Sequence, residues 1–213
     1  MSLVAGRGKR LGWLIVAALA ISGAWWGKGE LERRSNPTQD DGKPLPRPKR
    51  NAPYIQSKDP VIAKMVEVAK LTDQDLVYDL GCGDGRIIIA AAAASGCRGV
   101  GFDIDPARVE EARQNARQAG VDDRVTIEQH DIFDVDLRPA QVAMMYLLPW
   151  MMQDLKPQFE QMQPGSRIIS HDFPIDGVEP DAVYAVPLTD VSERHVVYLY
   201  TIPFQPKPAR QPN

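Results

Sequence analysis

The stretch Val77-Tyr78-Asp79-Leu80-Gly81-Cys82-Gly83-Asp84-Gly85-Arg86 decides the fold of this 213-residue chain. A β-prone run ends in an acidic residue, glycines follow at alternate positions, and an Ile/Ala-rich run starts directly after them. Glycine allows a sharp turn with positive φ and lets a ligand lie against bare main chain. A helix that begins after such a loop points its free N–H groups at that ligand. The stretch therefore predicts a strand, a ligand-binding loop and a helix.

Asp79 separates two classes of ligand. A dinucleotide loop must leave room for a pyrophosphate, which a carboxylate would repel, and its glycines follow the spacing Gly-x-Gly-x-x-Gly. Gly81, Gly83 and Gly85 do not have that spacing. A carboxylate attracts an ammonium group instead, and S-adenosylmethionine carries an ammonium group and no phosphate. The residues thus favour S-adenosylmethionine, and an ordinary strand-to-helix turn is the alternative.

Two further acids follow the loop at informative positions. Asp103 ends a predicted strand about 20 residues beyond the glycines, where a Rossmann-like unit places a carboxylate on ribose hydroxyls. Asp131 follows a third predicted strand, residues 125–129. Each acid by itself also fits a surface loop or a solvated turn. Their order and spacing behind the glycine loop favour one shared site.

The pattern Asp-x-Gly-x-Gly-x-Gly resembles motif I of class I S-adenosylmethionine-dependent methyltransferases. With Tyr-Leu-Leu-Pro at 146–149 and Ser-His-Asp-Phe at 170–173, residues 54–203 are similar to small bacterial members of this class. Those in turn resemble the membrane-associated protein-lysine methyltransferases of mitochondria that modify ATP synthase subunits. The resemblance implies an α/β fold with a Rossmann-like, mostly parallel seven-stranded sheet. Its expected order is 3-2-1-4-5-7-6, with the last strand antiparallel and helices on both faces, and the alternation of strands and helices along the chain agrees with it.

The resemblance also implies S-adenosyl-L-methionine as cofactor and a set of residues that hold it. These are Tyr54, Asp79, Gly81, Cys82, Gly83, Gly85, Asp103, Asp131 and Ile132. Asp131 would accept a hydrogen bond from the adenine amino group, and the N–H of Ile132 would meet a ring nitrogen. Two roles fit Tyr54, contact with the methionine end of the cofactor or packing of the next helix onto the sheet. No metal ion is expected.

The segment after the predicted fourth strand is the candidate methyl-transfer mouth. A lysine amine must react in its neutral form, and with a reference pKa of ~10.4 roughly 4–5 kcal/mol opposes deprotonation at neutral pH. An apolar mouth lowers that pKa because it disfavours the cation. Residues 146–150 would supply such a mouth, with the Tyr146 hydroxyl or a backbone carbonyl aiming the amine. Tyr146 as a plain core residue is the alternative.

The sequence departs from related chains in two places that bear on the acceptor. Gln141 stands at the start of the fourth strand, where many relatives carry an acid, so we expect no carboxylate base there. The Asn-Pro-Pro-Tyr signature of DNA adenine and glutamine methyltransferases is absent, which argues against an amide or a base nitrogen as acceptor.

An uncharged stretch at residues 11–26 follows Arg7, Lys9 and Arg10. Sixteen residues at ~1.5 Å each reach ~24 Å, short of the ~30 Å hydrocarbon core, so both a short span and a signal peptide fit. Trp25 and Trp26 are typical of an interfacial anchor, and export would separate the domain from its cytosolic cofactor. We expect residues 1–27 to form a hydrophobic helix that anchors the domain on the cytoplasmic side. Cleavage and export is the alternative.

Charge and composition divide the rest of the chain. A basic Pro-rich linker is expected at 28–51, a methyltransferase domain at 52–203 and a disordered tail at 204–213. The first 50 residues carry ten basic and four acidic side chains, and the remainder carries 15 and 24. An acidic domain argues against nucleic-acid substrates, and the two cysteines, Cys82 and Cys97, provide neither a disulfide framework nor zinc spacing.

The sequence predicts a membrane-anchored methyltransferase that modifies a protein lysine, with membrane proteins among the candidate substrates. A small or lipid-soluble acceptor is the alternative. A non-catalytic cofactor-binding module is disfavoured by the intact set of acids and glycines.

Overall fold

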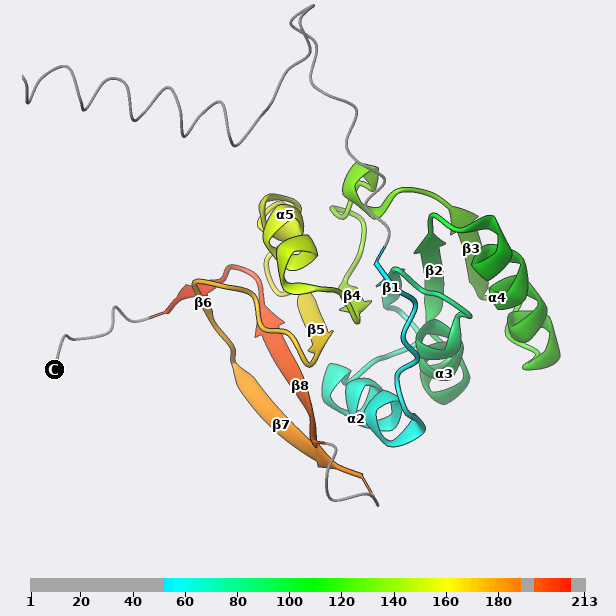
Figure 1. Ribbon diagram of the computed structural model, residues 1–213, viewed down its shortest axis with the longest axis horizontal. Coiled ribbons are helices and arrows are strands. Elements are labelled where there is room, and N and C mark those ends of the chain that lie inside the picture. The colour runs from blue at the N-terminus through cyan, green and yellow to red at the C-terminus, as the bar shows by residue number, and fades with distance from the viewer. Residues whose placement is uncertain (1–51, 189–193, 208–213) are drawn as a thin grey trace, which may run out of the picture. The chain divides into compact units, whose positions relative to one another are not determined.

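A seven-stranded sheet forms the centre of the residues described by this computed structural model, 52–188 and 194–207 (Figure 1). Its strands are β1 (Leu76–Leu80), β2 (Arg98–Asp103), β3 (Val125–Gln129), β4 (Val142–Met145), β5 (Arg167–His171), β7 (Ala182–Pro187) and β8 (Arg194–Thr201). The helices are α2 (Asp59–Ala69), α3 (Arg86–Ser95), α4 (Pro106–Gln118), the 3-10 turn η1 (Ile132–Asp134) and α5 (Pro149–Phe159).

The strand order is β3-β2-β1-β4-β5-β8-β7. Strands β1 to β5 run parallel, and β8 is antiparallel to both β5 and β7. Counted along the chain within this sheet, the order is 3-2-1-4-5-7-6, which confirms the expected topology. The labels differ from that count because β6 (Val178–Glu179) pairs instead with β9 (Gln205–Pro206) in a separate two-stranded sheet.

Helices cover both faces of the sheet, as the sequence predicted. Two clusters of buried apolar side chains lie on opposite faces of the sheet, and strand β4 contributes to both. Val142 and Met144 belong to the first cluster, and Ala143 and Met145 belong to the second. Side chains alternate across a strand, so a fully buried strand needs an apolar layer on each side. Helices α2, α3 and α4 contribute to the first cluster, and α5 and η1 to the second.

Local signals place the helix ends. The Asp105 side chain accepts the Ala107 N–H at 2.8 Å at the start of α4, with Pro106 in the first turn. Gly120, with a φ of +67°, follows its C-terminus. Pro157 lies inside α5, which continues past it to Phe159.

Several expected segments lie outside the described residues, namely the anchor at 1–27 and the linker at 28–51. Among the helices that the structure describes, none has the length and apolar character needed to cross a membrane. Within the segment 204–213, which was expected to be a disordered tail, Gln205 and Pro206 pair with β6. Residues 208–213 are outside the described part of the chain.

Candidate active site

The glycine loop connects β1 to α3 at the carboxyl edge of the parallel strands. The N–H groups of Gly81 and Cys82 both donate to the Phe102 carbonyl at 2.9 Å, which ties the loop to the end of β2. Gly83 has a φ of +55°, and a Cβ built on it would lie 2.3 Å from a ring carbon of Tyr54. Only glycine fits this position, because the conformation is left-handed and another side chain already covers the backbone.

Tyr54 lies over the loop rather than only between α2 and the sheet. Its ring faces Gly83 and stands 4.9 Å from the Arg108 guanidinium, in a cation–π contact. The residue is 42 % exposed, and burial raises the pKa of its hydroxyl, with Gln56 and Asp84 as polar neighbours. Tyr54 therefore lies at the loop that is predicted to hold the cofactor, and its contact with the methionine end stays a prediction.

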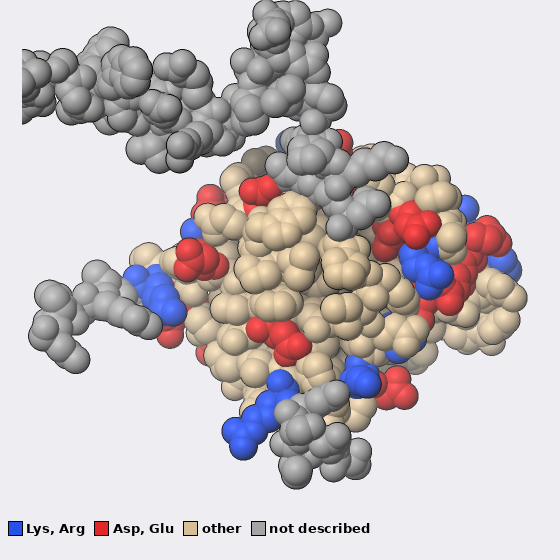
Figure 2. Space-filling model, in the orientation of Figure 1, with Lys and Arg blue, Asp and Glu red and all other residues tan. Residues whose placement is uncertain are grey.

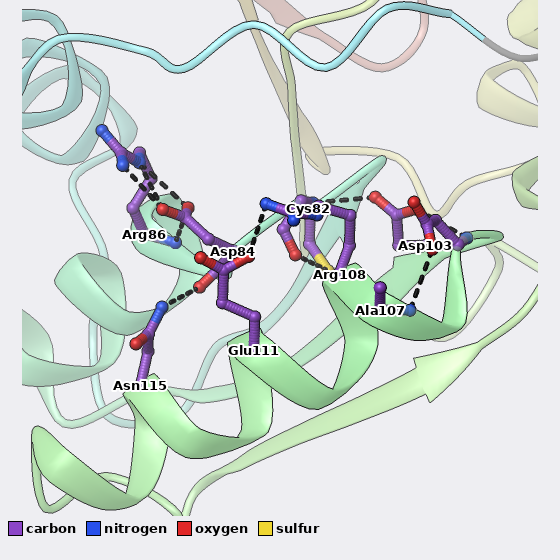
Figure 3. Close-up of polar contacts among 10 residues, drawn as sticks. Cys82, Asp84, Arg86, Asp103, Ala107, Arg108, Glu111 and Asn115 are labelled. Atoms are coloured by element: carbon purple, nitrogen blue, oxygen red, sulfur yellow. Dashed lines mark hydrogen bonds and ion pairs between the residues drawn. The ribbon is translucent and has the colours of Figure 1, made fainter.

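A polar network connects the loop to α4, as Figure 3 shows, and also to the segment that precedes α2. Arg86 pairs with Asp84 at 2.6 Å and donates to the Ser57 carbonyl at 3.1 Å. The Asn115 side chain donates to the Asp84 carbonyl at 2.9 Å. Burial opposes ionisation of Asp84, but its hydrogen bonds with Arg86 hold its pKa below the usual range. Asp84 is therefore a fixed negative charge beside the loop.

Asp103 is joined to the glycine loop directly. One carboxylate oxygen accepts the Gly83 N–H at 2.9 Å, and the other accepts the Asp105 N–H at 2.9 Å. Each carboxylate oxygen has two acceptor positions, so both retain one for a further donor. A vicinal diol could donate to both oxygens, as the sequence predicted for ribose.

Asp79 is completely enclosed by protein. One of its carboxylate oxygens accepts the Ile88 N–H at 3.3 Å, in the first turn of α3. The other has no hydrogen-bond partner within the described residues. Burial, together with the nearby charges of Asp103 and Asp84, raises the pKa of Asp79 to about 8. No surface of this side chain is open in the structure, so its contact with an ammonium group stays a prediction.

The remaining predicted binding residues differ in what they can offer. Asp131 is partly buried and caps η1, accepting the Phe133 N–H at 3.0 Å. The N–H of Ile132, at the first position of that turn, has no acceptor within the turn. Cys82 points into the core, and burial raises the pKa of its thiol, so only its main chain can meet a ligand.

Tyr146 follows β4 and packs against the end of β5. Its ring centroid lies 3.9 Å from that of His171, and its hydroxyl donates to Asp172 at 3.3 Å. Burial raises the pKa of this hydroxyl. Leu147, the next residue, is buried and approaches the position that a Cβ on Gly81 would take. Tyr146 thus has a polar partner at the end of β5, and its role in methyl transfer stays a prediction.

Sequence reasoning missed several residues of this region. Ser57, Arg86 and Arg108 brace or approach the loop, and His171 and His195 meet beside Tyr146. The Ser-His-Asp-Phe segment was noticed as a motif, but nothing in the sequence indicated that His195 would join it. That contact depends on the antiparallel pairing of β5 with β8.

The donor set tests which cofactor fits. Asp103 and Asp84 place two carboxyl groups beside the loop, and Arg86 holds the pKa of Asp84 below its usual range. This arrangement repels a pyrophosphate and suits a nucleoside with a cationic, phosphate-free chain. S-adenosylmethionine has that chemistry. Asp103 would hold its ribose and the loop main chain would lie against its amino-acid portion.

Sheet order, glycine loop and carboxylates together define a class I S-adenosylmethionine-dependent methyltransferase. The model of the ANTKMT methyltransferase domain matches residues 79–182. A protein-lysine N-methyltransferase of Saccharolobus islandicus is 42% identical over 154 residues, which cover 71% of this chain and 94% of that protein. The chain therefore belongs to the family of class I S-adenosylmethionine-dependent methyltransferases.

Other relatives agree with this assignment. A human lysine N-methyltransferase of an ATP synthase subunit is 30% identical over 132 residues, which cover 62% of this chain and 56% of that protein. The crystal structure of an RNA methyltransferase from Salinibacter ruber, in complex with S-adenosyl-L-homocysteine, has a TM-score of 0.64 and 45% identity. That comparison covers 70% of this chain and 94% of the other.

Proposed function

We propose that this chain is a membrane-anchored enzyme that methylates a lysine side chain of a protein. The observation that carries the proposal is the 42% identity to a protein-lysine N-methyltransferase that the chain covers over 94% of its length. The mouse adenine nucleotide translocase lysine N-methyltransferase and the human ATP synthase lysine N-methyltransferase support the same type of acceptor. The chain spans about half the length of these two relatives, 47% and 56%.

The residues after β4 offer a suitable entrance for a lysine. Tyr146 and Leu148 are partly buried, and Trp150 is 39 % exposed and stacks on Phe133 with ring centroids 5.9 Å apart. An apolar, aromatic wall disfavours an ammonium ion and so lowers the pKa of an approaching amine. It also accommodates the four-carbon stem of lysine.

Exposed apolar side chains are found on the segments that carry the site. Tyr54 and Ile55 precede α2, Ile104 follows β2, and Trp150 lies in the first turn of α5. Their side chains are 42 %, 58 %, 48 % and 39 % exposed, in that order. Large exposed apolar side chains that gather at one edge are typical of an interaction surface. They support a substrate with apolar surroundings, such as a membrane protein.

The chemistry divides between the cofactor and the chain. The cofactor supplies a methyl group on a positively charged sulfur, which is already activated. The chain has to bind the cofactor through the loop and Asp103, align the amine with the methyl group and exclude water. We assign the alignment to Tyr146, whose hydroxyl donates to Asp172 and keeps its oxygen lone pairs for an N–H of the amine.

The anchor belongs to the proposal as well. Residues 1–27 would span the membrane once, and the basic linker at 28–51 would lie on the cytoplasmic side, where anionic headgroups attract it. An enzyme held in this way meets membrane proteins in two dimensions. A lipid-soluble acceptor would benefit from the same arrangement, and it is the alternative substrate class.

An RNA substrate is a second candidate because the similar Salinibacter ruber structure is described as an RNA methyltransferase. The charge balance disfavours it, since the residues after position 50 carry 24 acidic and 15 basic side chains. Figure 2 shows one face, on which the basic side chains stand in small separate groups rather than in one continuous patch. RNA binding depends on a continuous basic surface.

One labelling experiment separates these acceptors. Cells that lack the enzyme are fractionated, and each fraction is incubated with the full chain and S-adenosylmethionine labelled on the methyl group. We expect label in a membrane protein, recovered as methylated lysine after acid hydrolysis, and much less of it with Asp103→Asn at the same cofactor concentration. Label in the lipid extract would support the lipophilic acceptor, and label lost on ribonuclease treatment would support RNA. No label in any fraction, with cofactor binding intact, would point to a non-catalytic module.

The anchor is tested separately. Alkaline carbonate should leave the full chain in the membrane pellet, and protease added to sealed inverted vesicles should digest the domain. Release by carbonate, or recovery of a chain shortened at its N-terminus outside the cytoplasm, would refute the anchored arrangement.

A further inference from the structure

Polar atoms of three side chains meet beside Tyr146: His171 ends β5, Asp172 directly follows it, and His195 lies in β8. His171 Nε2 lies 3.0 Å from His195 Nδ1 and 3.3 Å from an Asp172 carboxylate oxygen, which lies 2.9 Å from His195 Nδ1. These strands are neighbours in the sheet although the two histidines are 24 residues apart (Figure 1). The three atoms therefore form a closed triangle with sides of 2.9 to 3.3 Å.

Hydrogen bonds cannot satisfy all three sides of this triangle. A ring nitrogen carries either one proton or one lone pair. If both histidine nitrogens carry a proton, both can donate to Asp172, but their N–H groups then face each other at 3.0 Å. If either nitrogen carries a lone pair, that lone pair faces the carboxylate. Either way one short contact is repulsive, and a cation between the three atoms would remove the repulsion.

The dimensions match those of a coordinated metal ion. Ligands at ~2.0–2.1 Å from an ion stand about 2.9–3.0 Å apart at a right angle and about 3.4 Å apart at the tetrahedral angle. The three measured separations lie within this interval or at its edge. Two imidazoles and one carboxylate are a ligand set for Zn²⁺ with a fourth position open. We propose that His171, Asp172 and His195 bind a divalent transition-metal ion, with Zn²⁺ as the expected species.

The surroundings of the three ligands fit this assignment. The other ring nitrogen of His171 is 2.9 Å from the Ser57 hydroxyl. The second Asp172 oxygen accepts the Val196 N–H at 2.9 Å. Metal ligands in proteins are oriented by such outer contacts. Asp172 also has a φ of +60°, a costly conformation for a residue other than glycine, and one that recurs at ligand sites.

Hydrogen bonds link the proposed ligands to the methyl-transfer mouth on one side and, through Ser57, to the glycine loop on the other. Asp172 accepts a hydrogen bond from Tyr146, the residue at the methyl-transfer mouth. Ser57 continues the segment that carries Tyr54 over the glycine loop, and its carbonyl accepts from Arg86. Asp172 and His195 are partly exposed, at 21% and 17% of the side chain, which leaves a route for the ion to enter. The inference does not depend on which acceptor the enzyme uses.

Metal content and affinity test the site. The full chain, with any affinity tag removed, is treated with chelator, equilibrated with Zn²⁺, and its bound metal is measured by mass spectrometry. We expect one ion per chain and a rise in Tm on loading. Co²⁺ in place of Zn²⁺ should give visible absorption bands of a site with nitrogen and oxygen ligands.

Matched variants make the result specific. His195→Ala and Asp172→Asn should abolish binding, and asparagine tolerates the left-handed backbone of Asp172. Ser57→Ala should weaken it ~10–100-fold, the usual cost of losing an outer contact. His130→Ala removes the one histidine outside the cluster and should bind normally. Less than stoichiometric binding by the wild type, or equal binding by His195→Ala and His130→Ala with both folded by circular dichroism, would overturn the proposal.

Discussion

Replacing Gly83 by alanine tests whether the close approach of Tyr54 to the loop matters for cofactor binding. A Cβ on Gly83 would lie 2.3 Å from one carbon of the Tyr54 ring and 2.9 Å from another. Real Cβ contacts are not that short, so either the ring or the loop must shift. The same loop residue donates its N–H to Asp103 at 2.9 Å. A shift therefore affects the carboxylate assigned to the ribose.

The structure offers a control with the same backbone strain and no contact. Gly120 has a φ of +67°, close to the +55° of Gly83, and a Cβ there would meet nothing within 4 Å. Both alanine variants should lose about 1–2 kcal/mol of stability, the cost of an L-residue in the left-handed conformation. Only Gly83→Ala should also weaken binding of S-adenosylhomocysteine, by ~10-fold or more, which corresponds to ~1.4 kcal/mol.

The assay is calorimetric titration with S-adenosylhomocysteine, together with urea unfolding of each variant. The double variant Gly83→Ala, Tyr54→Ala should recover part of the affinity, because the shorter side chain makes room for the new methyl group. Equal dissociation constants for Gly83→Ala and Gly120→Ala would refute the reasoning. They would mean that backbone strain alone accounts for the effect of the substitution.

Four further changes have defined outcomes. Asp103→Asn should weaken S-adenosylhomocysteine ~10–100-fold, the equivalent of one hydrogen bond to a charged group; an unchanged calorimetric dissociation constant would remove Asp103 from the site. Burial raises the pKa of Asp79 to about 8, against ~3.9 in the unfolded chain, so the folded state binds its proton more tightly between these values. As the pH rises from ~4 to ~8, the free energy of unfolding of the ligand-free wild type, measured in urea, should therefore fall relative to that of Asp79→Asn. If the free energies of unfolding of both proteins change with pH in parallel, this prediction is contradicted. Arg167→Leu should lower the free energy of unfolding in urea by about 2 kcal/mol, because Arg167 pairs with buried Asp75 and donates to the carbonyls of Ala69 and Lys70. The control is Arg138→Leu, which breaks an exposed pair with Asp136 and should leave the urea midpoint unchanged. Similar midpoints for the two variants would argue against a stabilising role of the buried pair. Tyr146→Phe should lower kcat ~10-fold without changing cofactor affinity, as one weak hydrogen bond would, and an unchanged kcat would show that its hydroxyl takes no part.

Much of the fold follows from local signals in the sequence. Strand β4 is apolar at every position, which predicts burial on both faces, and the structure confirms it. Asp105 and Pro106 start α4 where their capping chemistry predicts. The strand order came from the resemblance to methyltransferases, because spacing along the chain does not specify which strands pair.

The candidate site was only partly predictable. The glycines, Asp103 and Asp131 lie at strand ends, and strand ends of a parallel sheet meet at one edge. Asp79 was expected to face a ligand, yet the structure encloses it, because α3 begins directly over the end of β1 and covers its side chain. The sequence can identify a side chain with suitable chemistry, but the helices and strands packed around that side chain decide whether a ligand can reach it.

The sequence by itself determined the loop, the helix ends and the class of cofactor. Each of these depends on the conformational freedom or charge of a few adjacent residues. The tertiary structure alone decided that Tyr54 lies on Gly83, and that His195 meets His171 and Asp172. Those contacts require β8 to run antiparallel beside β5 and the N-terminal segment to cross the loop. Both arrangements are fixed by burial of apolar surface across the whole domain, which no short stretch of sequence encodes.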